Sequence, residues 1–332
     1  MEHISSVLAL ASALLLADGG DVRLGNVPDG GFAERSAAAV WSRSLQNPEQ
    51  AHDPRTRASS KTSEAGASAA RSGRFRLLTY NVAGLPQIVS KSRPAQNSPL
   101  VSGLLNLYDM ALVQEDFSYH SMLSSRALHE YRSEPMLATR ALVSDGLSHF
   151  SRFAFAGLSR VRWRRCSGYV SAASDCLADK GFSHTRVALA PELFVDVYNL
   201  HADAGGTLPD VDVRQHNFEQ LAEYVQAHSK DNAVIVAGDT NLRMVNPRDV
   251  LTLTRFLDAT QLRDVCRSLR CAEERVDRVL IRSSAALELS ALGWWKDSHF
   301  VDATGAPLSD HPAIGVELSF RGLVPAALVA GR

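Results

Sequence analysis

The sequence Ser309-Asp310-His311-Pro312, followed directly by the apolar run from Ala313 to Leu318, decides the fold. Four other polar segments lie beside short apolar or β-branched runs in the same way: Thr79-Tyr80-Asn81, Gln114-Glu115, Leu200-His201-Ala202 and Gly238-Asp239-Thr240-Asn241. Runs of that kind are typical of buried strands. Strand ends that carry carboxylates, amides and imidazoles form a catalytic rim where they converge. The sequence therefore predicts an active site at one edge of a sheet.

The order of the apolar runs predicts an α/β domain. We expect strands at residues 75–78, 110–113, 186–189, 193–198, 233–237, 276–281 and 313–318. Residues on one face recur at three- to four-residue spacing between Val213 and Val225, which predicts a helix over 211–228, and a second helix is expected over 247–257. Two mixed sheets with helices outside fit this order.

Composition sets the class of protein. The chain has 332 residues, a formal net charge of −1, 45% hydrophobic and 21% charged residues, which suits a globular enzyme. A nearly neutral chain has no global positive field to gather nucleic acid or anionic membrane. An anionic substrate must then be held by local charges or by a metal ion.

The chain before residue 74 has two parts of different composition. Residues 7–17 are apolar or small, too few to span a bilayer but suited to the core of a secretory signal. We predict a signal peptide over 1–18 and a secreted or periplasmic protein; an ordinary N-terminal helix is the alternative, because no Lys or Arg precedes the apolar stretch. Residues 19–73 predict a flexible leader. The catalytic domain is expected over 74–320, with a tail over 321–332.

The four cysteines form two close pairs along the sequence, Cys166 with Cys176 and Cys266 with Cys271. Local disulfides of this kind would suit an oxidising compartment. Four reduced thiols in a cytosolic protein are the alternative. No cysteine belongs to a CxxC motif, so a zinc site is not expected.

The polar residues at the strand ends occur in one order: Asn81, Glu115, His201, Asp239 with Asn241, Asp277, and Asp310 with His311. In that order they resemble the endonuclease/exonuclease/phosphatase superfamily. Its members include deoxyribonuclease I, abasic-site endonucleases, inositol polyphosphate phosphatases and neutral sphingomyelinases. The resemblance extends from Phe75 to Val316. It implies a four-layer α/β sandwich, hydrolysis of a phosphate ester, and a divalent cation, usually Mg²⁺, with Mn²⁺ as the alternative.

The residue types alone suit this chemistry. Hydrolysis of a phosphodiester needs a positioned water, a base for its proton, and positive charge or hydrogen-bond donors at the nonbridging oxygens. His311 is the natural base. Its neighbour Asp310 points to the other side of a strand or turn, so Asp277 is the better candidate to hold the imidazole. His201 would stabilise charge across the phosphate or protonate the leaving group.

The oxygen-bearing side chains supply the remaining predicted roles. Glu115 ends a buried strand and is best explained as a magnesium ligand. Asn81 would support that ligand or the phosphate, and Asp310, carried over by resemblance, would add a metal contact. Asp239 should orient the water or meet the leaving oxygen, while Asn241 donates an amide hydrogen bond to the substrate phosphate.

Two positions depart from the superfamily pattern. No acidic residue stands two positions after Asn81, where abasic-site endonucleases use one as an extra ligand, so a single-metal site is favoured. Arg278 follows Asp277, where an aromatic residue or His is common in the superfamily. Either the packing around His311 differs or Arg278 reaches the substrate; the sequence does not choose.

Short stretches of sequence around the predicted site residues favour one class of substrate. Thr79-Tyr80-Asn81-Val82 and His201-Ala202-Asp203 resemble the sphingomyelinase branch, and near-neutral charge suits a zwitterionic head group. Deoxyribonuclease I shares the His-Ala context. We predict a secreted, metal-dependent phosphodiesterase that acts on a phospholipid such as sphingomyelin. A deoxyribonuclease I-like endonuclease is the alternative, and a binding module that has lost catalysis is a third interpretation.

Trp294 and Trp295 lie ahead of the last Asp-His pair. Sphingomyelinase-like members of the superfamily place an aromatic hairpin near this position to contact lipid, so the resemblance offers a peripheral membrane contact. Packing in the core or on a sheet is the favoured alternative. We predict no obligate protein partner and a monomer.

Overall fold

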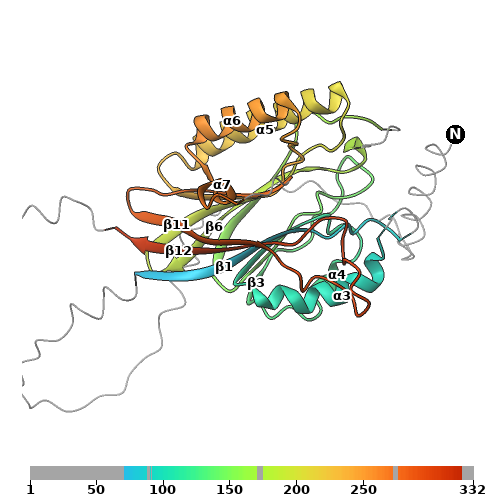
Figure 1. Ribbon diagram of the computed structural model, residues 1–332, viewed down its shortest axis with the longest axis horizontal. Coiled ribbons are helices and arrows are strands. Elements are labelled where there is room, and N and C mark those ends of the chain that lie inside the picture. Colours follow the sequence, from blue (N-terminus) through green and yellow to red (C-terminus); the bar gives the residue numbers. More distant parts are fainter. Residues whose placement is uncertain (1–70, 88–89, 91, 170–174, 272–275, 324–332) are drawn as a thin grey trace, which may run out of the picture.

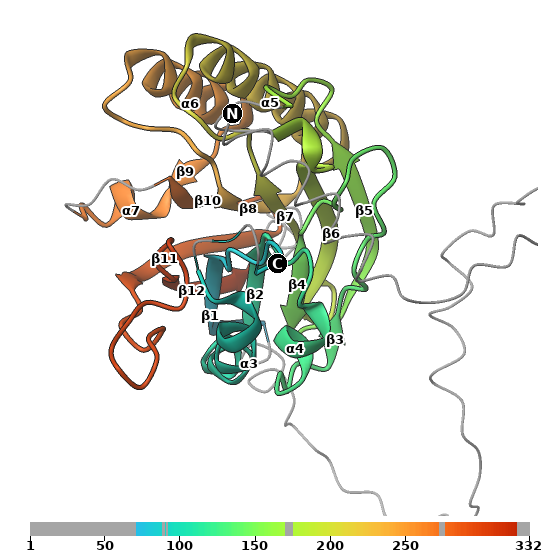
Figure 2. The same cartoon turned by 90° about the vertical axis from the view of Figure 1, so that its right-hand side faces the viewer.

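The computed structural model describes residues 71–87, 90, 92–169, 175–271 and 276–323. The predicted signal peptide, the leader up to residue 70 and the tail from residue 324 lie outside this part of the chain. The described residues form two six-stranded sheets that face each other, with helices on the two outer sides (Figures 1 and 2). No helix in the described part is long and apolar enough to cross a membrane.

The first sheet has the strand order β11-β12-β1-β2-β4-β3. Its strands are β1 (Ser72–Asn81), β2 (Met110–Gln114), β3 (Tyr131–Arg132), β4 (Ser148–Ser151), β11 (Leu287–Lys296) and β12 (Ile314–Gly322). Strands β1 and β2 pair in parallel and the other neighbours are antiparallel. The ends of β1 and β2 therefore lie at the same edge of the sheet as the start of β12.

The second sheet has the order β5-β6-β7-β8-β10-β9. Its strands are β5 (Phe155–Arg162), β6 (Gly181–Ala190), β7 (Leu193–His201), β8 (Ala233–Asp239), β9 (Arg263–Asp264) and β10 (Asp277–Arg282). Only β7 and β8 pair in parallel among them. As a result β7 and β8 end where β10 begins. We call this end of the two sheets, where β1, β2, β7 and β8 end, the catalytic edge.

The helical elements are α3 (Pro94–Leu104), η2 (Leu105–Leu107), α4 (His120–Ser124), η3 (Asp175–Leu177), α5 (Leu208–His228), α6 (Pro247–Thr260) and α7 (Val265–Ser268). Helix α5 begins after a capping box in which Thr207 and Asp210 satisfy each other's backbone N–H groups. Helix α6 begins after Asn246, whose side chain accepts from the Arg248 N–H. Both helices thus start at the catalytic edge, directly after the loops that follow β7 and β8.

Three apolar clusters hold the layers together. Leu77, Leu112, Val197 and Ile235 are fully buried between the two sheets. Helices α5 and α6 cover the outer face of the second sheet, while α3 and α4 cover the first. Each such side chain contributes about 1.5–3 kcal/mol when fully buried. The predicted four-layer α/β sandwich is confirmed, and every predicted strand and helix is present.

Candidate active site

The register of the strands brings the predicted polar residues together. Asp239 stands opposite His201 on one side and opposite Asp277 on the other. Asn81, the last residue of β1, is buried, and Ser309 donates its hydroxyl proton to the Asn81 carbonyl at 2.7 Å. That bond fixes the turn before β12 against the end of β1. The two sheets therefore contribute to one site at the catalytic edge.

Asn81 connects two carboxylates across the sheets. Its Nδ2 donates to Glu115 Oε1 at 2.9 Å and to Asp239 Oδ2 at 3.2 Å. The Ala83 N–H donates to Asn81 Oδ1 at 3.0 Å, which fixes the amide orientation. Glu115 has φ +59°, a left-handed backbone conformation that is uncommon for residues other than glycine. A strained residue of this kind is typical of functional sites, and here the carboxylate lies beside Asn81 and His201.

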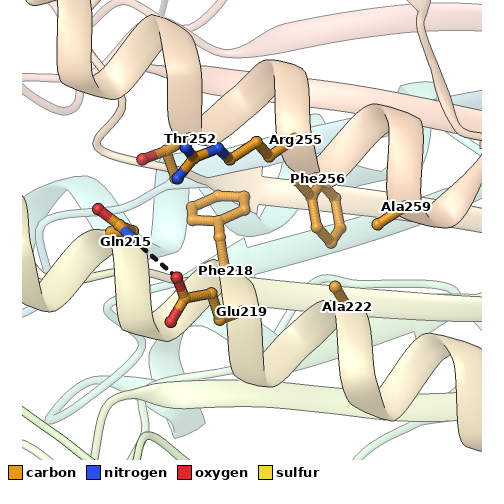
Figure 3. Close-up of a pocket in the computed structure, with 8 residues that line it drawn as sticks. All are labelled: Gln215, Phe218, Glu219, Ala222, Thr252, Arg255, Phe256 and Ala259. Atoms are coloured by element: carbon orange, nitrogen blue, oxygen red, sulfur yellow. Dashed lines mark hydrogen bonds between the residues drawn. The ribbon is translucent and has the colours of Figure 1, made fainter.

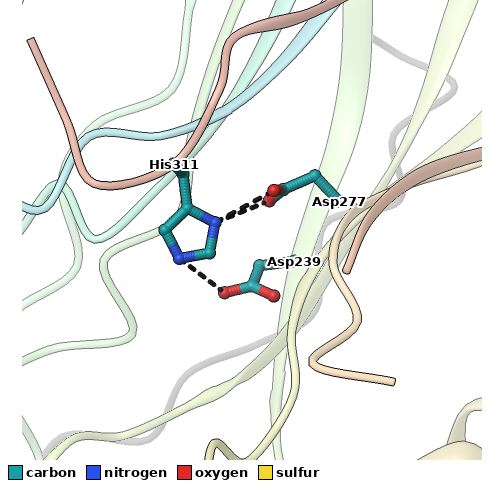
Figure 4. A group of neighbouring side chains, drawn as sticks. All are labelled: Asp239, Asp277 and His311. Atoms are coloured by element: carbon teal, nitrogen blue, oxygen red, sulfur yellow. Dashed lines mark hydrogen bonds and ion pairs between the residues drawn. The ribbon is translucent and has the colours of Figure 1, made fainter. Parts of the chain in front are cut away.

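His311 is paired with two carboxylates (Figure 4). Its Nδ1 lies 2.9 and 3.1 Å from the Asp277 oxygens, and its Nε2 lies 3.8 Å from Asp239 Oδ2. Burial alone would lower the pKa of His311, but the hydrogen bond with Asp277 and the charge of Asp239 raise it to about 10. Without a bound cation, His311 is held as an imidazolium.

His201 has the opposite electrostatic character. It is buried, its Nε2 lies 3.4 Å from Asp239 Oδ2 and 3.8 Å from Glu115 Oε1, and Trp163 donates its indole N–H to the His201 carbonyl at 2.7 Å. Burial, followed by the positive charges of Lys180 and His311, lowers the pKa of His201 well below its ordinary value. The imidazole is therefore neutral and suited to donate or accept one hydrogen bond.

Asp239 and Asn241 form a compact turn after β8. The Asn241 backbone N–H donates to Asp239 Oδ1 at 2.9 Å, and its side-chain amide donates to the Ala202 carbonyl at 3.0 Å and to Asp239 Oδ2 at 3.2 Å. Burial and the neighbouring Asp277 raise the pKa of Asp239 to about 6. The side-chain amide of Asn241 is thus held beside the Asp239 carboxylate at the catalytic edge.

Lys180 is a site residue that the sequence did not single out. Its ammonium is buried and lies 2.5 Å from Asp175 Oδ1. Burial lowers the pKa of Lys180, yet the carboxylates of Asp175, Glu115 and Asp203 outweigh it and raise the pKa overall. Burial raises the pKa of Glu115, and Lys180 offsets part of that effect. Lys180 is therefore a fixed positive charge behind Glu115.

Asp203 is a second functional candidate that the sequence did not identify. It is fully buried, and one carboxylate oxygen accepts from the Ser167 N–H at 2.8 Å while the other has no partner. Burial and the nearby Asp175 raise the pKa of Asp203 to about 7. In the sequence, Asp203 stands out only as part of the His201-Ala202-Asp203 string, without a separate role of its own.

Two predicted residues lie away from the centre of the site. Asp310 is exposed and accepts from the Ser309 hydroxyl at 3.3 Å, on the outer side of the turn. Arg278 is buried and donates to Asp264 Oδ2 at 2.9 Å. Its strand neighbour Asp277 points to His311, so alternation along β10 directs Arg278 to the other face. A metal contact by Asp310 and a substrate contact by Arg278 remain predictions.

The donor set suits a hard divalent cation. Glu115 presents a carboxylate that keeps partial exposure to solvent, with a side chain 21% exposed. Asp239, Asp277 and His311 also have ligand atoms within 4.8 Å of one another. Since His311 Nδ1 faces Asp277, this trio is better suited to hold the imidazole. The oxygen ligands of Glu115 fit Mg²⁺, which takes one or two protein carboxylates and retains several waters.

The remaining predicted features are structural. Both cysteine pairs form disulfides, Cys166 with Cys176 and Cys266 with Cys271, which confirms that prediction. Trp294 packs against the cluster between the sheets, and Trp295 stacks on Tyr108 with ring centroids 6.3 Å apart. These contacts are those expected from packing.

A groove between α5 and α6 lies on the outer layer (Figure 3). Phe218 and Phe256 form its floor, with ring centroids 5.1 Å apart, and Gln215 donates to Glu219 at its rim. It brings together none of the predicted catalytic residues. The groove is a packing feature of two helices.

Comparison with known proteins gives the fold and similar sequences. No family model matches the chain. The sphingomyelinases of Mycobacterium bovis and Mycobacterium tuberculosis are 32% identical over 267 residues, which cover 73% of this chain and 52% of theirs. A crystal structure of sphingomyelinase C from Streptomyces griseocarneus has a TM-score of 0.55 at 16% identity, covering 74% of this chain and 99% of that chain. The chain has the fold of the endonuclease/exonuclease/phosphatase superfamily and is similar in sequence to these sphingomyelinases.

Other solved members of this superfamily share the fold. A mutant of beta toxin from Staphylococcus aureus with bound magnesium ions has a TM-score of 0.55 at 14% identity, over 74% of this chain and 99% of that chain. TDP2 from D. rerio, complexed with a single-strand DNA product, has a TM-score of 0.57 at 16% identity, over 74% and 98%. At these identities the likeness establishes the fold alone. The chain spans about half the length of the curated relatives it matches.

Proposed function

We propose that this protein is a secreted, divalent-cation-dependent phosphodiesterase that hydrolyses a phospholipid of the sphingomyelin type. The observation that carries the proposal is the arrangement of His311, Asp277 and Asp239 opposite Glu115 and His201 at one edge of two sheets. A nucleophile-activating imidazole, a carboxylate that orients it, and a separate carboxylate for a cation are the parts that phosphodiester hydrolysis requires.

The residues divide the chemistry between them. His311 Nε2 takes a proton from the attacking water, while Asp277 holds Nδ1–H and stabilises the imidazolium that forms. Neutral His201 donates a hydrogen bond to a nonbridging oxygen, and the Asn241 amide can do the same when the substrate replaces Asp239 Oδ2 or the Ala202 carbonyl as its acceptor. Asp239, with a pKa of about 6, orients the water or meets the leaving oxygen in this proposal. The lowered pKa of His201 favours a charge-stabilising hydrogen bond over proton donation to the leaving group.

A cation at Glu115 would supply positive charge at the nonbridging oxygens and would weaken the carboxylate field that raises the pKa of His311. Asn81 and Lys180 hold the Glu115 carboxylate in place for it, one through a hydrogen bond and the other through its charge. Mg²⁺ is the proposed ion, with Mn²⁺ as the alternative.

The charges near the site support a phospholipid more than a nucleic acid. The basic run at residues 160–165 lies on β5 and the loop after it; three of its four arginines pair with carboxylates, and the fourth, Arg165, contacts His216. These pairs are Arg160–Asp145, Arg162–Asp179 and Arg164–Glu223. Paired arginines have little positive charge to offer the regularly spaced phosphates of a polyanion. The name of the mycobacterial relatives points the same way.

Secretion is part of the same proposal. Disulfides persist in oxidising compartments, and both cysteine pairs of this chain are oxidised. The disulfides therefore support export. Cleavage of residues 1–18 would be read directly as the N-terminal sequence of the protein recovered from the medium or the periplasm.

One experiment tests the function. Full-length protein is offered sphingomyelin, plasmid DNA and inositol phosphates with Mg²⁺ and with chelator. We expect sphingomyelin to be cleaved fastest, the chelator to abolish cleavage, and His311→Ala to lower turnover at least about 100-fold. His299→Ala is the matched control, because His299 is an exposed imidazole that pairs with Asp297 outside the site. Cleavage of DNA alone would replace the lipid with the endonuclease alternative, and activity unchanged in His311→Ala would refute the mechanism.

A further inference from the structure

Large apolar side chains are unusually exposed at the catalytic edge. Among the described residues, five of them are more than 60% exposed: Val245 at 92%, Leu137 at 84%, Leu128 at 79%, Leu208 at 70% and Tyr169 at 64%. All except Leu128 lie at the catalytic edge, Leu208 as the first residue of α5 and the other three on loops. Single exposed apolar residues are ordinary, but their concentration at the entrance of a site indicates a contact surface.

Three of these side chains lie on neighbouring segments, and we call Tyr169, Leu208 and Val245 the apolar ridge. Ser167, two residues before Tyr169, donates to Asp203 at 2.8 Å and to Asp210 at 2.7 Å, which ties its loop to the start of α5. A Cβ atom on Gly206 would lie 3.5 Å from the Arg243 guanidinium. The loops next to Leu208 and Val245 therefore touch each other.

A buried arginine holds in place the loops beside the apolar ridge. Arg214 is fully buried and donates to both oxygens of Asp249 at 3.1 and 3.2 Å. The same guanidinium donates to the carbonyls of Asp203, Ala204 and Gly205 at 3.2, 3.1 and 2.9 Å. One buried side chain thus fixes the loop after β7 against the first turn of α6. If these loops folded over the apolar ridge, the hydrogen bonds of Arg214 would break. The ridge therefore stays exposed.

The ridge is continuous with the catalytic residues along the chain. Leu208 follows His201 by one short loop, and Val245 follows Asn241 by four residues. A surface that contacts the ridge would therefore lie beside the groups that hold the phosphate. Arg164 and Arg248, close to the ridge in the chain, pair with Glu223 and Asp212, whereas Arg165 contacts His216. The three side chains of the ridge carry no charge, which suits insertion into a zwitterionic surface.

We propose that Tyr169, Leu208 and Val245 insert into the interfacial region of a zwitterionic phospholipid bilayer and bring head groups to the active site. This inference rests on the proposed function, because it names the surface on which that site works. It assigns the membrane contact to loops at the helix starts, whereas Trp294 and Trp295 pack within the fold. An apolar contact of this kind needs no net positive charge.

The test compares a ridge variant with a matched control. The ridge variant carries Tyr169→Ser, Leu208→Ser and Val245→Ser; the control carries Leu107→Ser and Leu128→Ser, two exposed leucines away from the catalytic edge. Cosedimentation with sucrose-loaded sphingomyelin and phosphatidylcholine vesicles in chelator measures binding without turnover. We expect the ridge variant to bind about 100-fold more weakly and the control to bind like the wild-type protein. Val245→Ser alone should bind about tenfold more weakly, which guards against misfolding of the triple variant.

Turnover separates this inference from the proposed function. On vesicles the ridge variant should lose activity in step with binding, whereas on water-soluble p-nitrophenyl phosphorylcholine it should match the wild-type protein. Vesicle binding equal to that of the wild-type protein overturns the inference, even if the enzyme is active. A ridge variant that loses binding to plasmid DNA instead of vesicles also overturns it. If the wild-type protein cleaves neither lipid nor the soluble ester, the proposed function fails. Cosedimentation then still shows whether the ridge binds vesicles.

Discussion

Asp277→Asn would change the charge beside His311 while keeping the size of the side chain. In the structure both Asp277 oxygens lie within 3.1 Å of His311 Nδ1, and this contact is the largest influence that raises the pKa of His311. A neutral Asn amide lacks the negative charge that stabilises an imidazolium. Its N–H can also donate to His311 Nδ1, which favours the tautomer with its proton on Nε2, the atom that must accept the proton from water. We therefore expect two separate effects, one on the titration of His311 and one on turnover.

The size of each effect follows from the pKa of His311. The net rise from 6.5 to about 10 corresponds to about 5 kcal/mol, so Asp277, Asp239 and Asp310 together contribute at least that much against the opposing effect of burial. Because burial acts in the opposite direction, the variant's His311 pKa should fall by at least about two units. Loss of the orienting carboxylate costs a base of this kind about 10³- to 10⁴-fold in kcat.

The sign of the stability effect can also be stated. A raised folded-state pKa contributes stability that is complete below about 6.5 and is lost as pH rises through about 10. In chelator, the wild-type free energy of unfolding should fall between pH 7 and pH 10, and Asp277→Asn should lack most of that slope. Histidine NMR titration, urea unfolding and kcat measure the three quantities. Asp297→Asn, which alters the exposed His299 pair, is the control, and a kcat within tenfold of wild type for Asp277→Asn would refute the assigned role.

Three further changes test other parts of the site. Glu115→Gln should raise the Mg²⁺ concentration for half-maximal activity at least about tenfold, as titrated by activity and by calorimetry; an unchanged midpoint would move the cation elsewhere. Lys180→Met should destabilise the protein by about 3–5 kcal/mol in urea, because it leaves Asp175 unpaired and buried, and a loss below 1 kcal/mol would contradict that pairing. Asp249→Asn should lower Tm by roughly 6–20 °C through the stranded Arg214 charge, yet keep kcat at 25 °C within about threefold.

Much of the fold could be predicted because its central strands are continuous apolar runs. β8 is buried on both faces, so its sequence has only Val, Ile and Ala before its polar end, and β7 has a mainly apolar run that includes the buried Asp196 and Asn199. The edge strands gave no such signal. β5 is half exposed and contains Gly157 with φ +69°, and its pairing with β6 shifts register after Ala156. β11 has a comparable shift between Ala291 and Gly293. A bulge interrupts the two-residue period on which strand prediction depends.

The candidate site was predictable where residue type alone indicates chemistry. His311 and Asp277 are 34 residues apart, but a base and its orienting carboxylate were both recognisable, and the structure places them in contact. Lys180 carried no such signal, since a single lysine before a glycine is ordinarily a solvated surface residue. Its role depends on burial and on the surrounding carboxylates, which only the tertiary structure brings together.

The charge inventory explains why this site suits a cation. Glu115, Asp239 and Asp277 face one another across the two sheets, and burial raises the pKa of the first two. Lys180 and His311 are the cationic side chains that act on this group. Lys180 is already committed to Asp175, and His311 must lose its proton to act as a base. In the proposed mechanism, a divalent cation at Glu115 would allow the carboxylates to stay ionised while His311 becomes neutral, because it would supply the charge that the imidazolium otherwise provides.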